Sequence, residues 1–146
     1  LTLEKDFNDQ IIDIKKELKS NLLKDANISW QRNDHLHLTV YFVGEMEPEQ
    51  ISQMNEDLKK INLTGFSRSI NLTAISFFPN ESSQVLAVLV QPDSHLNSLH
   101  EEIEKTAVNI GCGSDLKAYR PHITLGRFKE KDRPQYEFGV FKEPLK

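Results

Sequence analysis

The chain has 146 residues, of which 38% are hydrophobic and 27% are charged, a composition typical of one soluble globular domain. No segment contains the roughly 20 consecutive apolar residues of a membrane-spanning helix, and the formal net charge of −4 argues against bulk binding of nucleic acid. The single cysteine, Cys112, excludes an internal disulfide and a cysteine-based zinc site. We expect a single domain over residues 1–146 that is monomeric and cytoplasmic, with a first strand truncated to Leu1–Leu3.

Two helices, a short strand and a longer strand are predicted in the first half of the chain after Leu1–Leu3. The first helix follows Asp6, its predicted N-cap, and the second begins at Pro48. Their inner faces consist of apolar residues at helical spacing, namely Phe7, Ile11, Ile14 and Leu18 in the first helix and Ile51, Met54, Leu58 and Ile61 in the second. Strands are predicted over 28–31 and over 35–43, where apolar and polar residues alternate up to Gly44.

The second half of the chain repeats this order of strands and helices. Strands over 70–77 and 85–91 are separated by a polar turn, which predicts an antiparallel pair. A third helix follows Asp93 or Ser94 and is terminated by Gly111. Its inner face consists of Leu96, Leu99, Ile103, Ala107 and Ile110. Further strands are predicted over 123–128 and 136–141. Mixed hairpins and helices favour an α+β fold over a doubly wound parallel sheet.

One short pattern, histidine, aliphatic residue, threonine and aliphatic residue, occurs once in each half of the chain. The two copies, named here the first and second H-x-T motifs, are His37-Leu38-Thr39-Val40 and His122-Ile123-Thr124-Leu125. Because side chains alternate between the two faces of a strand, the histidine and threonine of each motif share one face. If the two halves pack about a pseudo-twofold axis, the two polar pairs face each other across a cleft.

This set of side chains suits chemistry at a phosphodiester. Hydrolysis of a cyclic phosphate needs a base for the proton of water and an acid for the leaving oxygen, and two histidines can fill both roles near neutral pH. Two threonine hydroxyls can hold the non-bridging oxygens, and an arginine adds a bidentate, permanently charged donor. We therefore predict the two motif histidines as the catalytic pair and the two motif threonines as phosphate ligands.

Other interpretations compete with this one. A single H-x-T in a strand is typical of a hydrogen-bonded structural histidine, but two copies in corresponding places favour a functional pair. A non-catalytic RNA- or nucleotide-binding module would keep the same cleft. The histidine and threonine of both motifs are intact, which argues against this alternative, because a decayed site would be expected to lose at least one of them. A zinc-dependent hydrolase would use His35, His37 and His122 as ligands. His35 shares the face of His37 and either lines the cleft or is a solvated strand start, which we favour.

The stretches HLHLTVYFVGE (His35–Glu45) and RPHITLGRF (Arg120–Phe128) resemble the signatures of the 2H phosphoesterase superfamily. The closest likeness, over most of the chain, is to the bacterial and archaeal RNA 2′,3′-cyclic phosphodiesterases of the LigT type, historically named 2′–5′ RNA ligases. The family's four motif positions are matched by His37, Thr39, His122 and Thr124.

The resemblance implies a bilobal α+β fold, with two pseudo-symmetric antiparallel-sheet lobes, helices packed outside and a central cleft. It also implies hydrolysis of 2′,3′-cyclic phosphate at RNA or oligonucleotide ends to a 2′-phosphate, with no metal and no cofactor. In the mechanism that the resemblance provisionally implies, His37 is the acid and His122 is the base.

The arginine that binds the phosphate is predicted to be Arg127, with Arg120 at the rim of the site. Arg127 lies five residues after His122, so strict alternation turns it away from the site unless a bulge at Gly126 re-aims it. The resemblance favours Arg127, whereas the strand pleat favours Arg120, and both are kept as candidate phosphate ligands.

Aromatic residues near the motifs are candidates for stacking on a nucleobase. Tyr41 is the better candidate because it shares the face of His37 and Thr39, and Tyr119 is a weaker one. Phe42 lies five residues after His37, so the same count places it in the core.

Charge in the second half is concentrated around the second motif. Residues 117–133 contain six basic residues against two acidic ones, which favours either a binding surface for an RNA end or a solvated loop without a partner. His95 and His100 lie off the apolar face of the third predicted helix and are expected to be exposed polar residues.

Overall fold

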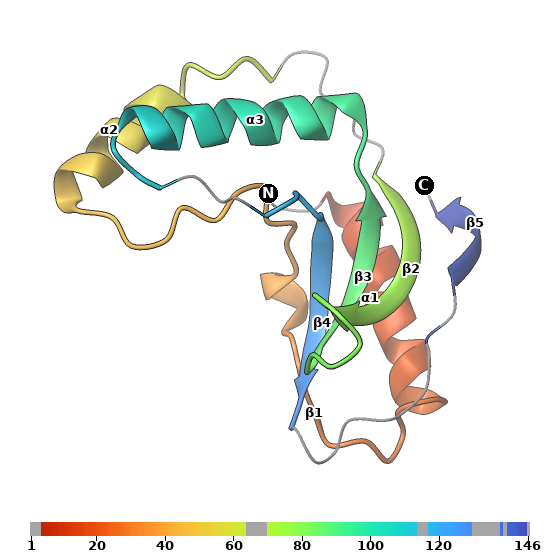
Figure 1. The fold of residues 1–146 in the computed structure, drawn as a ribbon. Coiled ribbons are helices and arrows are strands. Elements are labelled where there is room, and N and C mark those ends of the chain that lie inside the picture. Colours follow the sequence, from red (N-terminus) through yellow and green to blue (C-terminus); the bar gives the residue numbers. More distant parts are fainter. Residues whose placement is uncertain (1–3, 64–69, 114–116, 130–137, 139, 146) are drawn as a thin grey trace. The chain divides into compact units, whose positions relative to one another are not determined.

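The computed structural model of the protein describes residues 4–63, 70–113, 117–129, 138 and 140–145 (Figure 1). The chain divides into two compact units, which we call the first unit (Leu1–Leu38, Ile70–Gln91 and Pro121–Lys146) and the second unit (Thr39–Ser69 and Pro92–Arg120). The chain therefore passes from one unit to the other inside the first H-x-T motif, after Leu38, and again just before the second motif, after Arg120.

The first unit contains a five-stranded antiparallel sheet. In their order across the sheet, the strands are β1 (Ile28–Trp30), β4 (His122–Phe128), β3 (Val85–Gln91), β2 (Asn71–Phe78) and β5 (Val140–Leu145) (Figure 1). The predicted antiparallel pair is the hairpin of β2 and β3, and β1 and β4 also lie where the sequence predicts them. Predicted strand 136–141 overlaps β5 only in part, and residues 136 and 137 lie outside the described residues. The α+β fold is confirmed.

Alternation along the central strands builds the core of the first unit. Leu86 and Val88 of β3 are 0% exposed, as are Ile123 and Leu125 of β4. Successive residues of a strand point to opposite faces, so the intervening residues of β4 are left for the other face of the sheet.

Helix α1 (Lys5–Ser20) buries Phe7, Ile11 and Leu18 as predicted, but Lys15 is buried where Ile14 is expected. The Lys15 ammonium donates hydrogen bonds to the Gln31 carbonyl oxygen at 2.8 Å and to the Asn33 side-chain oxygen. Burial lowers the pKa of Lys15, and the positive charge of Lys19 lowers it further. A lysine can occupy the buried face because the loop after β1 supplies acceptors for its ammonium group.

The second unit contains two helices, α2 (Pro48–Leu58) and α3 (Ser94–Asn109) (Figure 1). Pro48 occupies the first turn of α2, as predicted. The N-cap of α3 is Asp93, whose carboxylate accepts a hydrogen bond from the Leu96 amide at 2.7 Å. Gly111 follows α3 with a φ of +85°, a conformation that glycine adopts without steric cost and that terminates helices.

The predicted inner face of α2 is largely exposed. Met54 is buried with Ala107 and Cys112, but Ile51 is 47% exposed and Leu58 is 37% exposed. The apolar spacing predicts the helix correctly and overestimates how much of its face is covered by other residues of the chain.

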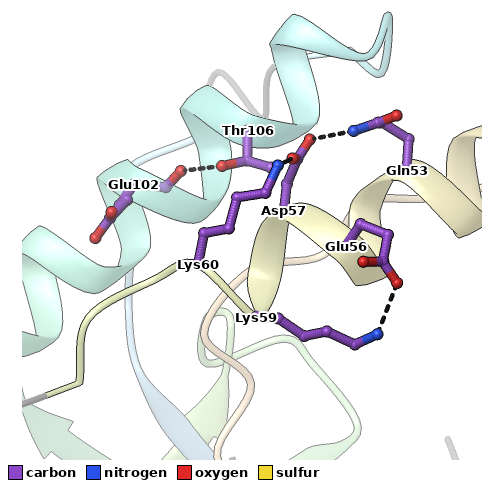
Figure 2. A network of polar contacts seen from close by, with 7 residues as sticks. All are labelled: Gln53, Glu56, Asp57, Lys59, Lys60, Glu102 and Thr106. Carbon is purple, nitrogen blue, oxygen red and sulfur yellow. Dashed lines mark hydrogen bonds and ion pairs between the residues drawn. The ribbon is translucent and has the colours of Figure 1, made fainter.

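Exposed polar side chains surround the end of α2 (Figure 2). Lys59 pairs with Glu56 at 2.6 Å, and Lys60 pairs with Asp57 at 2.7 Å. Hydrogen bonds from Lys60 and then Gln53 lower the pKa of the Asp57 carboxyl group. Because largely exposed ion pairs are screened by water, they add little to the stability of the fold.

The strand predicted over 35–43 is not formed. A short 3-10 helix, η1, spans Asn33–His35, and Leu38 makes an isolated antiparallel bridge with Ile123. Burial still alternates, since Leu36, Leu38 and Val40 are buried, but a strand also needs a hydrogen-bonded partner along its length. All strands of the described residues belong to the first unit, so the sheet expected for a second lobe is not found in this part of the chain. None of the described helices is long and apolar enough to cross a membrane.

Candidate active site

The imidazole of His37 is held by the backbone just before it. Its Nδ1 lies 2.8 Å from the carbonyl oxygen of His35. A carbonyl oxygen only accepts hydrogen bonds, so Nδ1 carries the hydrogen and Nε2 is left as the other ring nitrogen. The side chain is exposed. Nε2 of His37 is therefore the atom that can exchange a proton with a bound molecule.

The first two residues of the first H-x-T motif, which belong to the first unit, lie beside the second motif. The bridge joins Leu38 to Ile123, the residue between histidine and threonine in each motif, and both side chains are 0% exposed. In antiparallel pairing, the residues flanking such a pair point to the opposite face, which places His37 opposite Thr124 and diagonal to His122. Diagonal neighbours are typically about 7–8 Å apart. His37 and Leu38 thus lie next to the second motif, and the pseudo-twofold packing of the two halves stays a prediction.

The second motif lies on β4, with His122 and Thr124 half-buried and their aliphatic neighbours fully buried. The His122 ring stacks on the ring of Phe78, with centroids 3.6 Å apart and an interplanar angle of 20°. Phe78 is the last residue of β2, and the sequence argument does not identify it. No local pattern signals the contact, because β2 and β4 are separated in the sheet by β3.

The register of β3 and β4 shifts next to Gly126, where the sequence left a bulge open as one alternative. Leu86 and Ala87 are consecutive on β3, but they pair with Gly126 and Thr124, which leaves Leu125 as the extra residue of β4. An extra residue reverses the alternation beyond it. Arg127 is accordingly exposed and Phe128 is 1% exposed, so Arg127 lies on the same face as the half-buried residues of the second motif.

Glycine is required at the bulge because two neighbouring groups approach it closely. A Cβ at Gly126 would lie 2.9 Å from Ile28 Cδ1 and 2.9 Å from the carbonyl oxygen of Ser29. Both belong to β1, which pairs with this end of β4. The residue that re-aims Arg127 is therefore also the residue that lets β1 approach β4.

Three predicted site residues belong to the second unit. Thr39 is half-buried and Arg120 is exposed. The Tyr41 hydroxyl donates to the Gly113 carbonyl oxygen at 3.2 Å. The first unit brings together His37, His122, Thr124 and Arg127, and the roles of all seven residues remain predictions.

One expectation is corrected. Phe42 is 75% exposed rather than in the core, because the chain leaves regular pairing after Leu38 and the alternation count no longer applies. Within the described residues, no three or more His, Cys, Asp or Glu side chains form a group that could hold a metal ion. His35, His37 and His122 are all described, so the ligand set of the competing zinc interpretation is not formed.

The α+β fold, with the second H-x-T motif on β4 and Leu38 of the first motif bridged to it, agrees with the fold that the resemblance to 2H phosphoesterases implies. The chain belongs to the LigT-like phosphoesterase family, since the family model "LigT like Phosphoesterase" matches residues 1–87. The matched residues include the first motif and end before the second.

Relatives and solved structures extend this likeness. An RNA 2′,3′-cyclic phosphodiesterase of Thermotoga maritima is 29% identical over 127 residues, which cover 85% of this chain and 67% of the relative. One of Archaeoglobus fulgidus is 26% identical over 128 residues, covering 87% and 71%. A phosphoesterase crystal structure has a TM-score of 0.68 at 25% identity, covering 95% of this chain and 76% of that one. The E. coli LigT crystal structure with 3′-AMP has a TM-score of 0.67 at 24% identity, covering 95% and 76%, and shows the likeness of fold.

Proposed function

We propose that this protein hydrolyses 2′,3′-cyclic phosphates at RNA or oligonucleotide ends to 2′-phosphates by two-histidine acid–base catalysis. The observation that carries the proposal is the bridge between the two H-x-T motifs, which supports a common face for His37, His122 and Thr124. The names of several relatives, RNA 2′,3′-cyclic phosphodiesterase, support the choice of substrate.

The two histidines act in opposite protonation states. His122 takes a proton from water as the water oxygen attacks phosphorus, and His37 gives a proton to O3′ as the bond from phosphorus to O3′ breaks. The products are a 2′-phosphate and a free 3′-hydroxyl. The Nδ1 contact of His37 with the His35 carbonyl oxygen supports this assignment, because it leaves Nε2 to deliver the proton.

Uncharged and cationic donors stabilise the phosphate as negative charge develops on its oxygens. Thr39 and Thr124 bind non-bridging oxygens, and Arg127 adds a permanent charge that the bulge at Gly126 turns to the required face. Because these donors supply the electrostatic stabilisation, the reaction needs no metal. Arg120 and Tyr41 bind the nucleotide at the rim.

The basic residues around the second motif receive the RNA end. Lys117, Arg120, Arg127 and Lys129 are all exposed. They raise the local concentration of an anionic substrate although the whole chain carries a formal net charge of −4. The protein acts as a monomeric single domain.

The decisive assay is incubation with a nucleoside 2′,3′-cyclic phosphate, followed by identification of the product isomer. We expect the 2′-phosphate, and His37→Ala or His122→Ala should each lower kcat by about 10²–10⁴-fold with unchanged circular dichroism. His95→Ala, at an exposed histidine of α3, is the matched control and should retain wild-type turnover. Exclusive formation of the 3′-phosphate would contradict the proposed leaving group, and binding without turnover would favour the non-catalytic module.

A further inference from the structure

Three aromatic rings of the second unit form a cluster beside the end of the first motif. His100 of α3 stacks on Tyr119, with ring centroids 4.1 Å apart and an interplanar angle of 10°. Tyr41 packs against His100 at 5.4 Å with a tilt of 55°. His100 and Tyr119 are half-buried, so the expectation that His100 is an exposed polar residue is wrong.

The cluster is bonded to the backbone of the first motif. Nδ1 of His100 lies 2.8 Å from the carbonyl oxygen of Val40, and the Tyr119 hydroxyl donates to the carbonyl oxygen of Thr39 at 3.4 Å. Since a carbonyl oxygen only accepts, Nδ1 of His100 is the donor. Two consecutive carbonyl groups, one of them that of Thr39, are thus held by side chains that lie far along the chain.

Both anchors are themselves fixed. His100 follows Leu99, which is buried, on a helix whose N-terminus is capped by Asp93. Burial raises the pKa of Tyr119 to about 12, so its phenol keeps its proton and can donate near neutral pH. The segment after Leu38 lacks the ladder hydrogen bonds of a strand, and the cluster replaces them for Thr39 and Val40.

We propose that His100 and Tyr119 are positioning residues that fix the backbone of Thr39 and Val40 and thereby the direction of the Thr39 hydroxyl group. The inference rests on the proposed function, in which that hydroxyl binds a phosphate oxygen. A ligand that is displaced by about 1 Å can cost up to about 10²-fold in rate. His100 acts through Thr39 and does not touch the substrate.

Two variants of His100 separate the hydrogen bond from the aromatic packing. His100→Phe keeps a ring against Tyr119 and loses the donor, whereas His100→Asn loses the ring and places an amide donor near the position of Nδ1. We expect His100→Phe to lower kcat/KM by about 10-fold or more, mainly through kcat, and His100→Asn to recover most of the loss. His95→Phe, on the exposed side of the same helix, is the control and should behave as wild type.

A double-mutant cycle with Thr39→Val tests whether the effect passes through the threonine. If His100 only positions that hydroxyl, His100→Phe should lower kcat/KM by no more than about 2-fold in the Thr39→Val background. An equal loss of kcat/KM on His100→Phe in the wild-type and Thr39→Val backgrounds would overturn the inference. Wild-type kinetics for His100→Phe would also overturn it.

Backbone NMR order parameters keep this test separate from the proposed function. His100→Phe should lower the order parameters of Thr39–Tyr41 below the value of about 0.85 that is typical of rigid backbone, and His100→Asn should not, whether or not the protein turns over a cyclic phosphate. If wild type has no turnover, the proposed function fails while this readout still decides the anchoring. Unchanged order parameters in His100→Phe would overturn the positioning role.

Discussion

Gly126 joins a steric requirement to the proposed placement of Arg127 at a single residue. The bulge at this glycine restores Arg127 to the face of His122 and Thr124, and β1 lies too close to admit a side chain there. Glycine is required at this position because the groups next to it, a backbone carbonyl and an isoleucine side chain of β1, have little freedom to move away from an added methyl group.

Gly126→Ala should therefore reduce both stability and activity. Forcing a methyl group into this contact should lower the free energy of unfolding by about 1–3 kcal/mol. Urea denaturation measures that loss, and kcat/KM should fall as well because β4 and Arg127 shift together. Gly113→Ala is the matched control, since a Cβ there meets nothing within 4 Å and its φ is not positive. Equal free energies of unfolding for the two variants would contradict this prediction, because β1 would then move away from residue 126 without a loss of stability.

Phe78→Leu tests the stack on His122. Loss of the flat ring removes the surface on which the imidazole stacks, so we expect kcat to fall by about 10-fold while the fold is retained. Phe78→Tyr keeps the ring and should keep most of the activity. The imidazole proton resonances of His122 report the contact directly, because an aromatic ring 3.6 Å away shifts them. Unshifted resonances in Phe78→Leu would contradict the stacking.

At the scale of elements, local sequence signals predict the helices well, but they predict poorly which segments pair or bond with one another. Asp93 and Gly111 bound α3 as expected, because capping chemistry is local. Lys15 occupies a buried helical position that hydrophobic spacing assigns to Ile14, because its partners lie in a loop after β1. The segment over 35–43 alternates between buried and exposed residues like a strand, but within the described residues it forms isolated bridges and no strand. Alternation indicates burial and does not show that a neighbouring strand is present.

Lys15→Met should destabilise the first unit. The carbonyl oxygen of Gln31 and the side-chain oxygen of Asn33 would lose their donor, at a cost of about 1–3 kcal/mol. Burial lowers the pKa of Lys15 in the folded protein. Between this lowered pKa and the ordinary lysine pKa, the unfolded chain binds more protons than the folded chain. The free energy of unfolding of the wild type therefore rises with pH in this range. Denaturation at several alkaline pH values should show this gain in wild type only. Lys16→Met, at an exposed lysine, is the control.

At the scale of the whole molecule, the sequence identifies the motifs and the α+β fold, but not how the motifs meet. The repeat predicts a pseudo-twofold arrangement, which stays a prediction, but it does not reveal that Leu38 and Ile123 pair directly. The stack of Phe78 on His122 and the anchoring of Val40 by His100 join residues that are distant in sequence. Such contacts depend on the path of the chain, and no short pattern encodes them.

Exhaustive chelation should leave the activity unchanged. The described residues contain no group of side chains arranged to hold a metal. In the proposed mechanism, two histidines supply acid and base, and two threonines with an arginine supply the electrostatic stabilisation. Turnover before and after treatment with EDTA measures this. Loss of activity that zinc alone restores would require a metal-based mechanism.

The pH dependence of kcat/KM for a nucleoside 2′,3′-cyclic phosphate tests the two-histidine mechanism most directly. One imidazole must be neutral and the other protonated, so the profile should be bell-shaped, with both limbs in the range where histidines change charge, about pH 5–8. The two limbs belong to the coupled pair, and removal of either histidine should remove one limb from the residual activity. A rate that rises monotonically with pH would contradict the account and indicate attack by hydroxide or by a metal-bound water.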